Sequence, residues 1–209
     1  MEGHAGGKVT GGMNIQERVT QILSAEAAAI LAVRVTPEFE RALLALRDCP
    51  GKVLTAGMGK AGHIARKFAS TLCSTGTPAS YIHPGEAAHG DLGLIGPEDC
   101  LVVFSTSGKT REVIEMLELG RHLGLRTVIG VTSHPDSELR DLSDIVLDMG
   151  VVEEPCPYRL TPTASIVVML AISDAVALAL MELKGFSRHD FGLRHHGGYL
   201  GKRARTDNE

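Results

Sequence analysis

Short apolar runs alternate with segments of helical periodicity along most of this chain. Five runs have the length and composition of buried strands: 52–56, 79–82, 100–104, 126–132 and 145–148. Helical patterns fill the intervals between them, and a long apolar helix is predicted over 163–184. Strands that alternate with helices predict an α/β fold, in which a mostly parallel sheet of about five strands forms the middle of three αβα layers.

The two ends of the chain differ from this pattern. Residues 14–47 predict two helices, the second starting near Pro37. Residues 1–13 are rich in Gly and polar side chains and lack the apolar core of a secretory signal, so a disordered leader is expected. Because no linker or repeat interrupts the fold, we predict a single domain over 14–201, followed by a flexible tail over 202–209.

A hydroxyl-rich turn follows the third predicted strand. Its residues are Ser105, Thr106, Ser107, Gly108 and Thr110, and a helical pattern begins directly after them. Hydroxyls and free backbone amides at a helix N-terminus form a cradle for an anion, so this turn predicts a phosphate site. An ordinary Ser/Thr helix cap is the simpler alternative and stays open.

Two better-known phosphate motifs do not fit the chain. The turn ends like a P-loop, but Val103 stands where that motif needs its first glycine. Gly57, Gly59 and Gly62 match G-x-G-x-x-G, yet the strand after them ends without the acidic residue that would hold a ribose. We therefore exclude a nucleoside triphosphate and NAD. Both loops follow strands and should share one rim of the sheet.

Several ionisable residues have simple structural interpretations. The loop with His83, Glu86, His89 and Asp91 lacks a recognised zinc spacing, so no functional metal is predicted. By spacing alone, the carboxylate pair of Glu153 and Glu154 is a solvated acidic loop. Likewise, an acid such as Glu112 suits the positive end of a helix dipole.

Composition narrows the remaining classes of function. A net charge of −4, no Trp and 4% aromatic residues do not indicate a nucleic-acid surface. The apolar stretch 166–181 is interrupted by Ser173 and Asp174, which favours a buried core helix over a membrane span. The four cysteines lack a CxxC spacing, so reduced thiols in a soluble, cytoplasmic protein are expected.

Five segments of the chain resemble sugar isomerase (SIS) domains in their order along the sequence: GMGKAG, HPGEAAHGD, STSGKT, EEPCPYRLTPTAS and HHGGYLG. The resemblance covers 14–201 and is greatest to the D-arabinose 5-phosphate isomerases that feed Kdo and lipopolysaccharide synthesis. Full-length members carry a pair of CBS domains after this region, so the chain resembles a short form. Lys109, where the family carries an acid, and Tyr199, where it carries a small residue, depart from the family pattern.

The resemblance implies an isomerisation of D-ribulose 5-phosphate to D-arabinose 5-phosphate through an enediol, with no cofactor and no metal. It implies that Lys60, Glu112, Glu154 and His195 are catalytic. Glu154 is our first choice for the enediol base, with a pKa raised by partial burial, and an exchange of roles with His195 stays open. The expected substrate-binding residues are Gly59, His89, Ser105, Thr106, Ser107, Gly108 and Thr110.

The same resemblance implies partners and rivals. A sugar phosphate is the expected ligand, and a product of the Kdo pathway that binds as a feedback signal is left open. The excess apolar helix surface, together with the assembly of SIS relatives as dimers of dimers, predicts a homotetramer. In it, His195 acts in its own or a neighbouring subunit. The alternatives are a non-catalytic sugar-phosphate sensor and an isomerase of another phosphosugar, such as a hexulose 6-phosphate.

Overall fold

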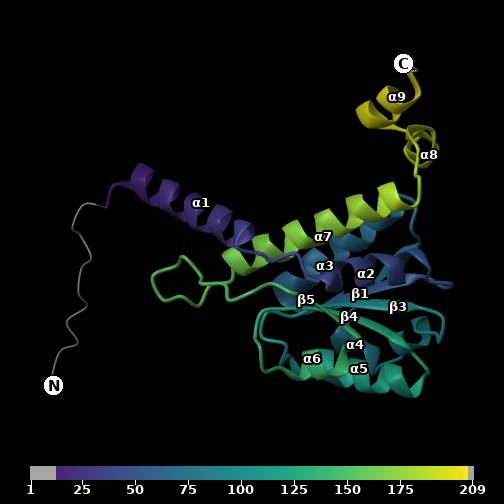
Figure 1. Cartoon of the computed structure of the whole chain (residues 1–209), viewed down its shortest axis with the longest axis horizontal. Helices are drawn as coiled ribbons and strands as arrows, with labels where there is room; N and C mark the ends of the chain where they lie inside the picture. Colours follow the sequence, from purple (N-terminus) through teal and green to yellow (C-terminus); the bar gives the residue numbers. More distant parts are fainter. Residues whose placement is uncertain (1–12, 207–209) are drawn as a thin grey trace.

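Five parallel strands form the centre of the computed structural model, which describes residues 13–206 (Figure 1). They are β1 (Val53–Gly57), β2 (Ala79–Ile82), β3 (Cys100–Phe104), β4 (Thr127–Thr132) and β5 (Ile145–Asp148). Every residue of β1 and β3 is buried, as continuous apolar runs predict for central strands of a parallel sheet. The predicted α/β architecture is confirmed.

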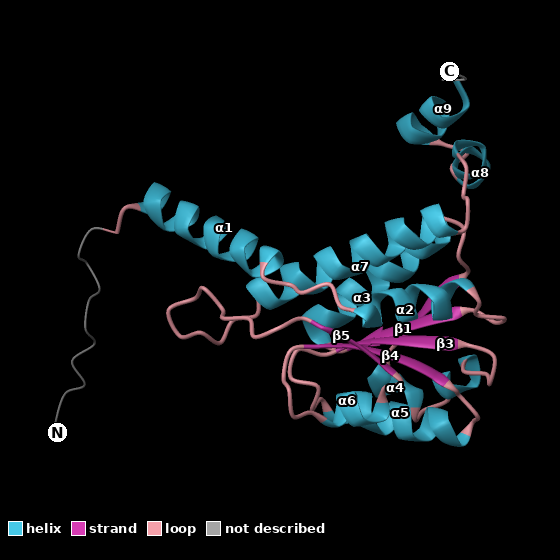
Figure 2. Cartoon of the chain, in the orientation of Figure 1, coloured by secondary structure: helices cyan, strands magenta, loops and turns pink. Residues whose placement is uncertain are grey.

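Helices cover both faces of the sheet, which gives the three predicted layers (Figure 2). One face carries α2 (Pro37–Arg47), α3 (Gly59–Ser74) and α7 (Ala164–Leu183). The other carries α4 (Pro84–Ala87), α5 (Arg111–His122) and α6 (Glu138–Leu142), with a 3₁₀ turn at Asp91–Leu94. The short α4 and the 3₁₀ turn lie within the segment whose histidines and acids the sequence places in a loop.

The core lies between these layers in two apolar clusters. Phe68 of α3 packs edge-on against Phe104 of β3, with ring centroids 5.8 Å apart, and both side chains are almost fully buried. Burying an aromatic or large aliphatic side chain stabilises a fold by about 1.5–3 kcal/mol. The residue that ends β3 and opens the hydroxyl turn is therefore held by the core itself.

The strand order places two loops side by side. The sheet runs β2-β1-β3-β4-β5, so the chain order reverses between β1 and β3, which is where open α/β sheets bind ligands. Gly57 pairs with Phe104 in register. The glycine loop after β1 and the hydroxyl turn after β3 thus leave the sheet at the same level, as expected.

Three helices project from the sheet and its layers (Figure 1). They are α1 (Ile15–Leu31), which leans on α7, and α8 (Arg188–Arg194) and α9 (Gly198–Thr206), which pack on each other. Along α1 the apolar side chains of Ile15, Val19 and Leu23 are more than half exposed. Helix α9 continues past the predicted domain end at residue 201; residues 1–12 and 207–209 of the predicted leader and tail lie outside the described residues.

Helix α7 is the longest apolar element. Among the described helices it alone has the length and composition to cross a membrane, but half of it is buried inside the protein. Its own side chains Val168, Met169 and Ile172 are part of the core cluster on this face of the sheet. This packing agrees with the predicted core helix.

Candidate functional site

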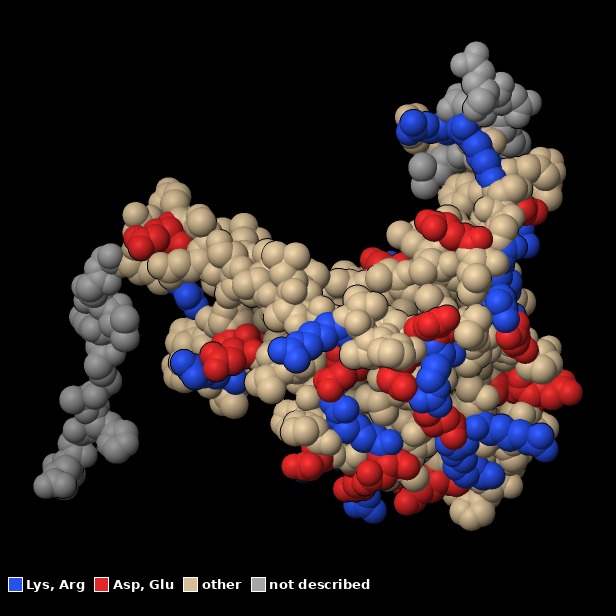
Figure 3. Space-filling view, viewed as in Figure 1, with Lys and Arg blue, Asp and Glu red and all other residues tan. Residues whose placement is uncertain are grey.

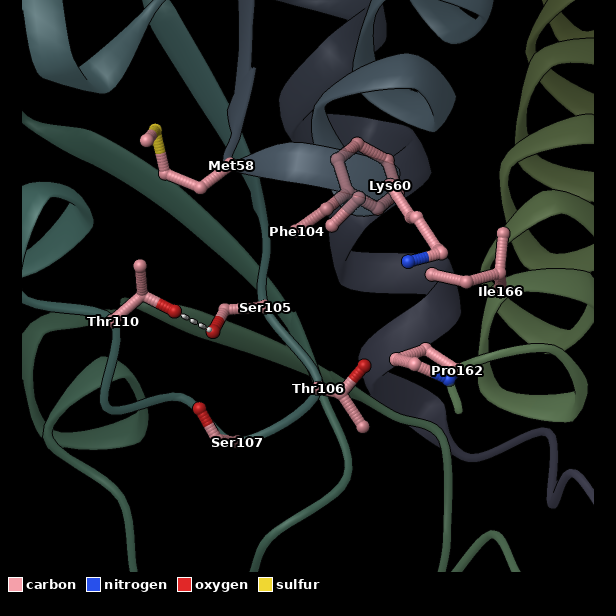
Figure 4. A pocket seen from close by; sticks show the side chains of 10 residues that line it. Met58, Lys60, Phe104, Ser105, Thr106, Ser107, Thr110, Pro162 and Ile166 are labelled. Atoms are coloured by element: carbon pink, nitrogen blue, oxygen red, sulfur yellow. Dashed lines mark hydrogen bonds between the residues drawn. The ribbon is translucent and has the colours of Figure 1, made fainter. Parts of the chain in front are cut away.

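The turn between β3 and α5 is a preorganised cradle of hydroxyl groups. The Ser105 hydroxyl lies 3.0 Å from the Thr110 hydroxyl and accepts a hydrogen bond from the Gly108 amide at 3.1 Å (Figure 4). The Ser107 hydroxyl accepts one from the Lys109 amide at 3.2 Å. These bonds hold three hydroxyls along one short loop. Ser107 and one member of the Ser105–Thr110 pair retain a proton that can be donated to an anion.

The N-terminus of α5 decides between a ligand site and a simple cap. Thr110 occupies the N-cap position, but within the described residues its side chain makes no capping hydrogen bond and meets Ser105 instead. The first amides of α5 therefore stay available to a ligand, and the helix dipole favours a negative charge there. The simpler alternative of a Ser/Thr cap does not describe this turn.

Close packing fixes the shape of the cradle. Gly108 has a φ of +62°, and a Cβ atom on it would lie 2.4 Å from the Ser137 hydroxyl and 2.9 Å from that of Thr132. The Gly108 carbonyl accepts a hydrogen bond from the Leu139 amide at 3.0 Å. Glycine is required here by both conformation and space.

The cradle forms one wall of a cavity of about 290 Å³. Figure 4 shows Lys60 extending from the start of α3 into the space that Thr106, Pro162 and Ile166 border. Among the described residues that line the cavity, Lys60 is the only cation. A single positive charge opposite an anion cradle suits a monophosphate or a developing oxyanion.

Glu154 caps α7 next to the wall that Pro162 and Ile166 form, but it is not itself among the described residues that line the cavity. Its carboxylate accepts hydrogen bonds from the amides of Thr163 and Ala164, each at 2.8 Å, and from the Ser165 hydroxyl at 2.5 Å. Burial opposes ionisation of the carboxyl, but these bonds outweigh it, so the pKa of Glu154 lies below its ordinary value. The predicted upward shift of this pKa is wrong, because the capping amides stabilise the charged form.

His195 does not reach the cavity of its own chain. It follows α8, its ring stacks on Phe191 at 3.8 Å, and its Nδ1 lies 2.9 Å from the Phe191 carbonyl oxygen. Between it and Glu154 runs α7, whose 20 residues extend for roughly 30 Å. Figure 1 shows α8 beyond the C-terminal end of α7, whereas the cavity adjoins its N-terminal end.

The other predicted site residues divide into two groups. Those that line the cavity are Lys60, Ser105, Thr106, Ser107 and Thr110. Glu112 and His89 are exposed and, in the described structure, are not among the lining residues; Gly59, with a φ of +56°, opens α3 beside Lys60. No group of three or more His, Cys, Asp or Glu side chains that could hold a metal occurs among the described residues.

Sequence reasoning missed the apolar wall of the cavity and the partner of Glu154. Met58, Phe104, Pro162 and Ile166 line the cavity. Two of them directly precede predicted site residues: Met58 precedes Gly59 and Lys60, and Phe104 precedes the hydroxyl turn. Ser165 had no signal, because its contact with Glu154 joins residues 11 positions apart.

Lys109 lies on the outer side of the cradle. It lines a separate open groove of about 490 Å³ with Arg111, Glu115, Glu118 and Glu138. The family's acid at this position is a lysine here, so the groove gains a positive charge among the carboxylates of Glu115, Glu118 and Glu138. The lysine does not add a cation to the described lining of the phosphate cavity.

The fold and the cavity define an α/β protein with a candidate anion site at the reversal point of a parallel sheet. The family model for the SIS domain matches residues 45–179, and the chain belongs to this family. It is 42% identical over 181 residues to the arabinose 5-phosphate isomerase KdsD of Pseudomonas aeruginosa. The match covers 87% of this chain and 55% of that protein, so the chain spans little more than half the length of this relative.

Two solved structures are similar over nearly their whole length. One comes from Bacteroides fragilis and is described as a phosphosugar isomerase involved in capsule formation, an activity assigned there without proof. It is 42% identical to this chain with a TM-score of 0.85. The similarity covers 88% of this chain and 98% of that one. A protein of E. coli CFT073, solved in complex with A5P, is 39% identical with a TM-score of 0.82, covering 88% of this chain and all of that one.

Proposed function

We propose that the protein interconverts D-arabinose 5-phosphate and D-ribulose 5-phosphate through an enediol. The observation that carries this proposal is the cavity in which a hydroxyl cradle, Lys60 and the Glu154-capped end of α7 adjoin one another. The names of the relatives support the choice of sugar. Residues 14–201 would form the isomerase domain.

The phosphate end of the sugar would be held by the cradle. Hydroxyls of Ser105, Ser107 and Thr110 and the first amides of α5 would donate hydrogen bonds to the phosphoryl oxygens. The Gly108 and Gly59 turns bring backbone close to the ligand, and Thr106 lines the space between the phosphate and the sugar carbons. This anchor supplies binding energy that holds C1 and C2 in place.

The chemistry at C1 and C2 needs one base and one proton shuttle. Starting from the open-chain aldose, a carboxylate removes the C2 proton to give the cis-enediol and returns it to C1, while the O2 proton moves to O1. Glu154 would be this base; its carboxylate is ionised at neutral pH, and the capping hydrogen bonds that lower its pKa make it a weaker base than a free glutamate. Lys60 would stabilise the enediolate oxygen, His195 would shuttle the hydroxyl proton, and Glu112 and His89 would position the sugar. In the reverse assignment His195 is the base and Glu154 the proton shuttle, and ordinary turnover in a Glu154→Gln variant would favour it.

Assembly would bring His195 to the chemistry. Because α7 separates His195 from the cavity of its own chain, we propose that His195 serves the site of a neighbouring subunit in a cytoplasmic homotetramer. Support comes from the exposed apolar side chains of Ile15, Val19 and Leu23 on α1. Figure 3 shows a broad uncharged band along α1 and α7 in this view. A product of the Kdo pathway would compete for the same cavity.

Incubation with D-ribulose 5-phosphate in deuterated water tests the activity. An isomerase produces D-arabinose 5-phosphate and exchanges the transferred proton with deuterium, which NMR detects at C1 or C2. Binding of the sugar phosphate without product or exchange would identify a sensor. Turnover of a hexulose 6-phosphate in place of the pentulose would identify a different phosphosugar isomerase.

A further inference from the structure

Arg140 of α6 joins the phosphate cradle to the loop that carries Glu154, although it lies outside the described lining of the cavity. Its side chain is mostly buried, with 21% exposed. Nε donates a hydrogen bond to the His134 carbonyl at 2.6 Å, and Nη2 lies 3.0 Å from Oδ1 of Asp148. Nη2 is not aligned for a hydrogen bond, so the contact with Asp148 is an attraction between charges. One guanidinium thus holds two separate turns.

The first turn supports the cradle. The amides of Ser133 and His134 donate hydrogen bonds to the Thr106 carbonyl at 3.1 and 3.4 Å, and the Thr132 hydroxyl donates to the same oxygen at 3.3 Å. That carbonyl lies between the two cradle serines in the sequence. Any shift of the turn at His134 is therefore transmitted to the backbone of the cradle.

The second turn begins the loop of Glu154. Oδ1 of Asp148 accepts a hydrogen bond from the Gly150 amide at 2.8 Å, and the Gly150 carbonyl accepts one from the Ser133 hydroxyl at 2.5 Å. Four residues later the chain reaches Glu154. The segment over Ser133 and His134 is therefore bonded to the cradle on one side and to the Glu154 loop on the other.

We propose that Arg140 is a positioning residue that keeps the phosphate cradle and the Glu154 loop in one fixed relation. The consequence for turnover rests on the proposed function, whereas the consequence for phosphate binding does not. A rigid link of this kind is what allows the bound phosphate to place the reacting carbons against the base. Lysine retains the charge but not the planar fork that contacts both turns.

Arg121 provides a matched control at the opposite end of the same strands. Its guanidinium donates hydrogen bonds to the carbonyls of Leu125, Arg126 and Leu142 and pairs with Asp144 at 2.8 Å. Arg126 precedes β4 and Asp144 precedes β5, so these two contacts lie at the ends of the strands opposite the cavity, and the contact with Leu142 lies at the C-terminal end of α6. Arg121→Ala therefore removes a similar network without touching either turn.

The experiment compares R140A, R140K and R121A with the unsubstituted chain. For each protein, thermal unfolding gives Tm, titration calorimetry with inorganic phosphate gives affinity, and steady-state kinetics give kcat and KM for D-arabinose 5-phosphate. We expect R140A to lower phosphate affinity about tenfold and kcat/KM about 100-fold, with a lower kcat and a higher KM. R140K should lie between R140A and the wild type, and R121A should lower Tm while phosphate affinity and kcat/KM stay unchanged.

The outcomes separate this inference from the proposed function. If the wild type does not isomerise the sugar, the proposed function fails, and the phosphate titration still tests Arg140. If R140A keeps phosphate affinity and both kinetic constants while its Tm falls as in R121A, Arg140 is only structural and the inference is overturned. Equal losses of phosphate affinity in R140A and R121A would overturn it as well. Should R140A fail to fold, the same comparison is made with R140K.

Discussion

The carboxylate of Glu154 and the hydroxyl of Ser165 lie 2.5 Å apart at the start of α7. The amides of Thr163 and Ala164 donate to the same carboxylate, which thereby satisfies the helix end and stays ionised. The group that we propose as the base thus also caps a core helix. The proposed catalytic role and the structural role can be separated by mutation.

Ser165→Ala should move the acid limb of the pH–rate profile to higher pH. Because hydrogen bonds from Ser165 and the helix amides hold the pKa of Glu154 below its ordinary value, loss of the hydroxyl raises this pKa. The stability that comes from the ionised carboxylate is present above its unfolded-state pKa and is lost as pH falls through the folded-state pKa. In the variant this contribution should be smaller, and its loss should be complete at a higher pH.

Measurements of kcat/KM and of thermal unfolding from about pH 3 to about pH 8 check this prediction. Ser173→Ala is the matched control, because Ser173 is buried in the same helix and donates to the Leu170 carbonyl, away from Glu154. An identical acid limb in the wild type and Ser165→Ala would show that Glu154 does not govern the rate.

Glu154→Gln should lower kcat by orders of magnitude with little change in affinity for the sugar phosphate. The amide retains the shape of the side chain but cannot take up the C2 proton. Loss of a charged cap should also cost about 1 kcal/mol of unfolding free energy. Kinetics and denaturant unfolding measure the two effects separately. Ordinary turnover in this variant would remove Glu154 from the chemistry and assign the base to His195.

Ser107→Ala should raise KM for the sugar phosphate about tenfold and leave kcat nearly unchanged, because the hydroxyl binds the phosphate and not the reacting carbons. Lys109→Ala, two residues further along the same loop, is the control. Lys109 lines the outer groove, so its loss should leave KM unchanged. A KM that does not respond to Ser107→Ala would place the phosphate elsewhere.

Gly108→Ala should abolish tight phosphate binding. The added methyl group meets the hydroxyls of Ser137 and Thr132 and is attached to a backbone with positive φ. Gly185→Ala is the matched control: its φ of +64° gives a similar backbone strain of about 1–2 kcal/mol, but no atom lies within 4 Å of the added group. Calorimetry with inorganic phosphate should show loss of binding in the first variant alone. Equal binding in both variants would contradict the role of the Gly108 turn.

Cys156 should react with iodoacetamide with a midpoint near pH 7. Its sulfur accepts hydrogen bonds from the amides of Thr161 and Leu160, each at 3.2 Å, which lowers its pKa to about 7. Reactivity should rise with pH because the thiolate is the nucleophile. Buried Cys100, whose pKa is raised by burial, is the internal control and should not react in the folded protein. Mass spectrometry of labelled peptides distinguishes the two thiols.

The sequence predicts the sheet well and the site only in part, for physical reasons. Runs such as 100–104 are apolar on both faces, and the structure places a strand over the same five residues. The four-residue helix α4 carries too few residues for a periodic signal. The partners of Glu154 lie across a Pro-rich loop, so spacing could not reveal that its pKa is lowered. The distance of His195 from the cavity depends on α8 leaving the end of α7, which local patterns do not encode.

A crystal structure with D-arabinose 5-phosphate bound tests the central claim most directly. The account predicts the phosphoryl oxygens within hydrogen-bond distance of the hydroxyls of Ser105, Ser107 and Thr110. It also predicts C1 and C2 between Lys60 and the carboxylate of Glu154. A phosphoryl group bound outside this cradle, or Glu154 turned away from the sugar in every subunit, would contradict it.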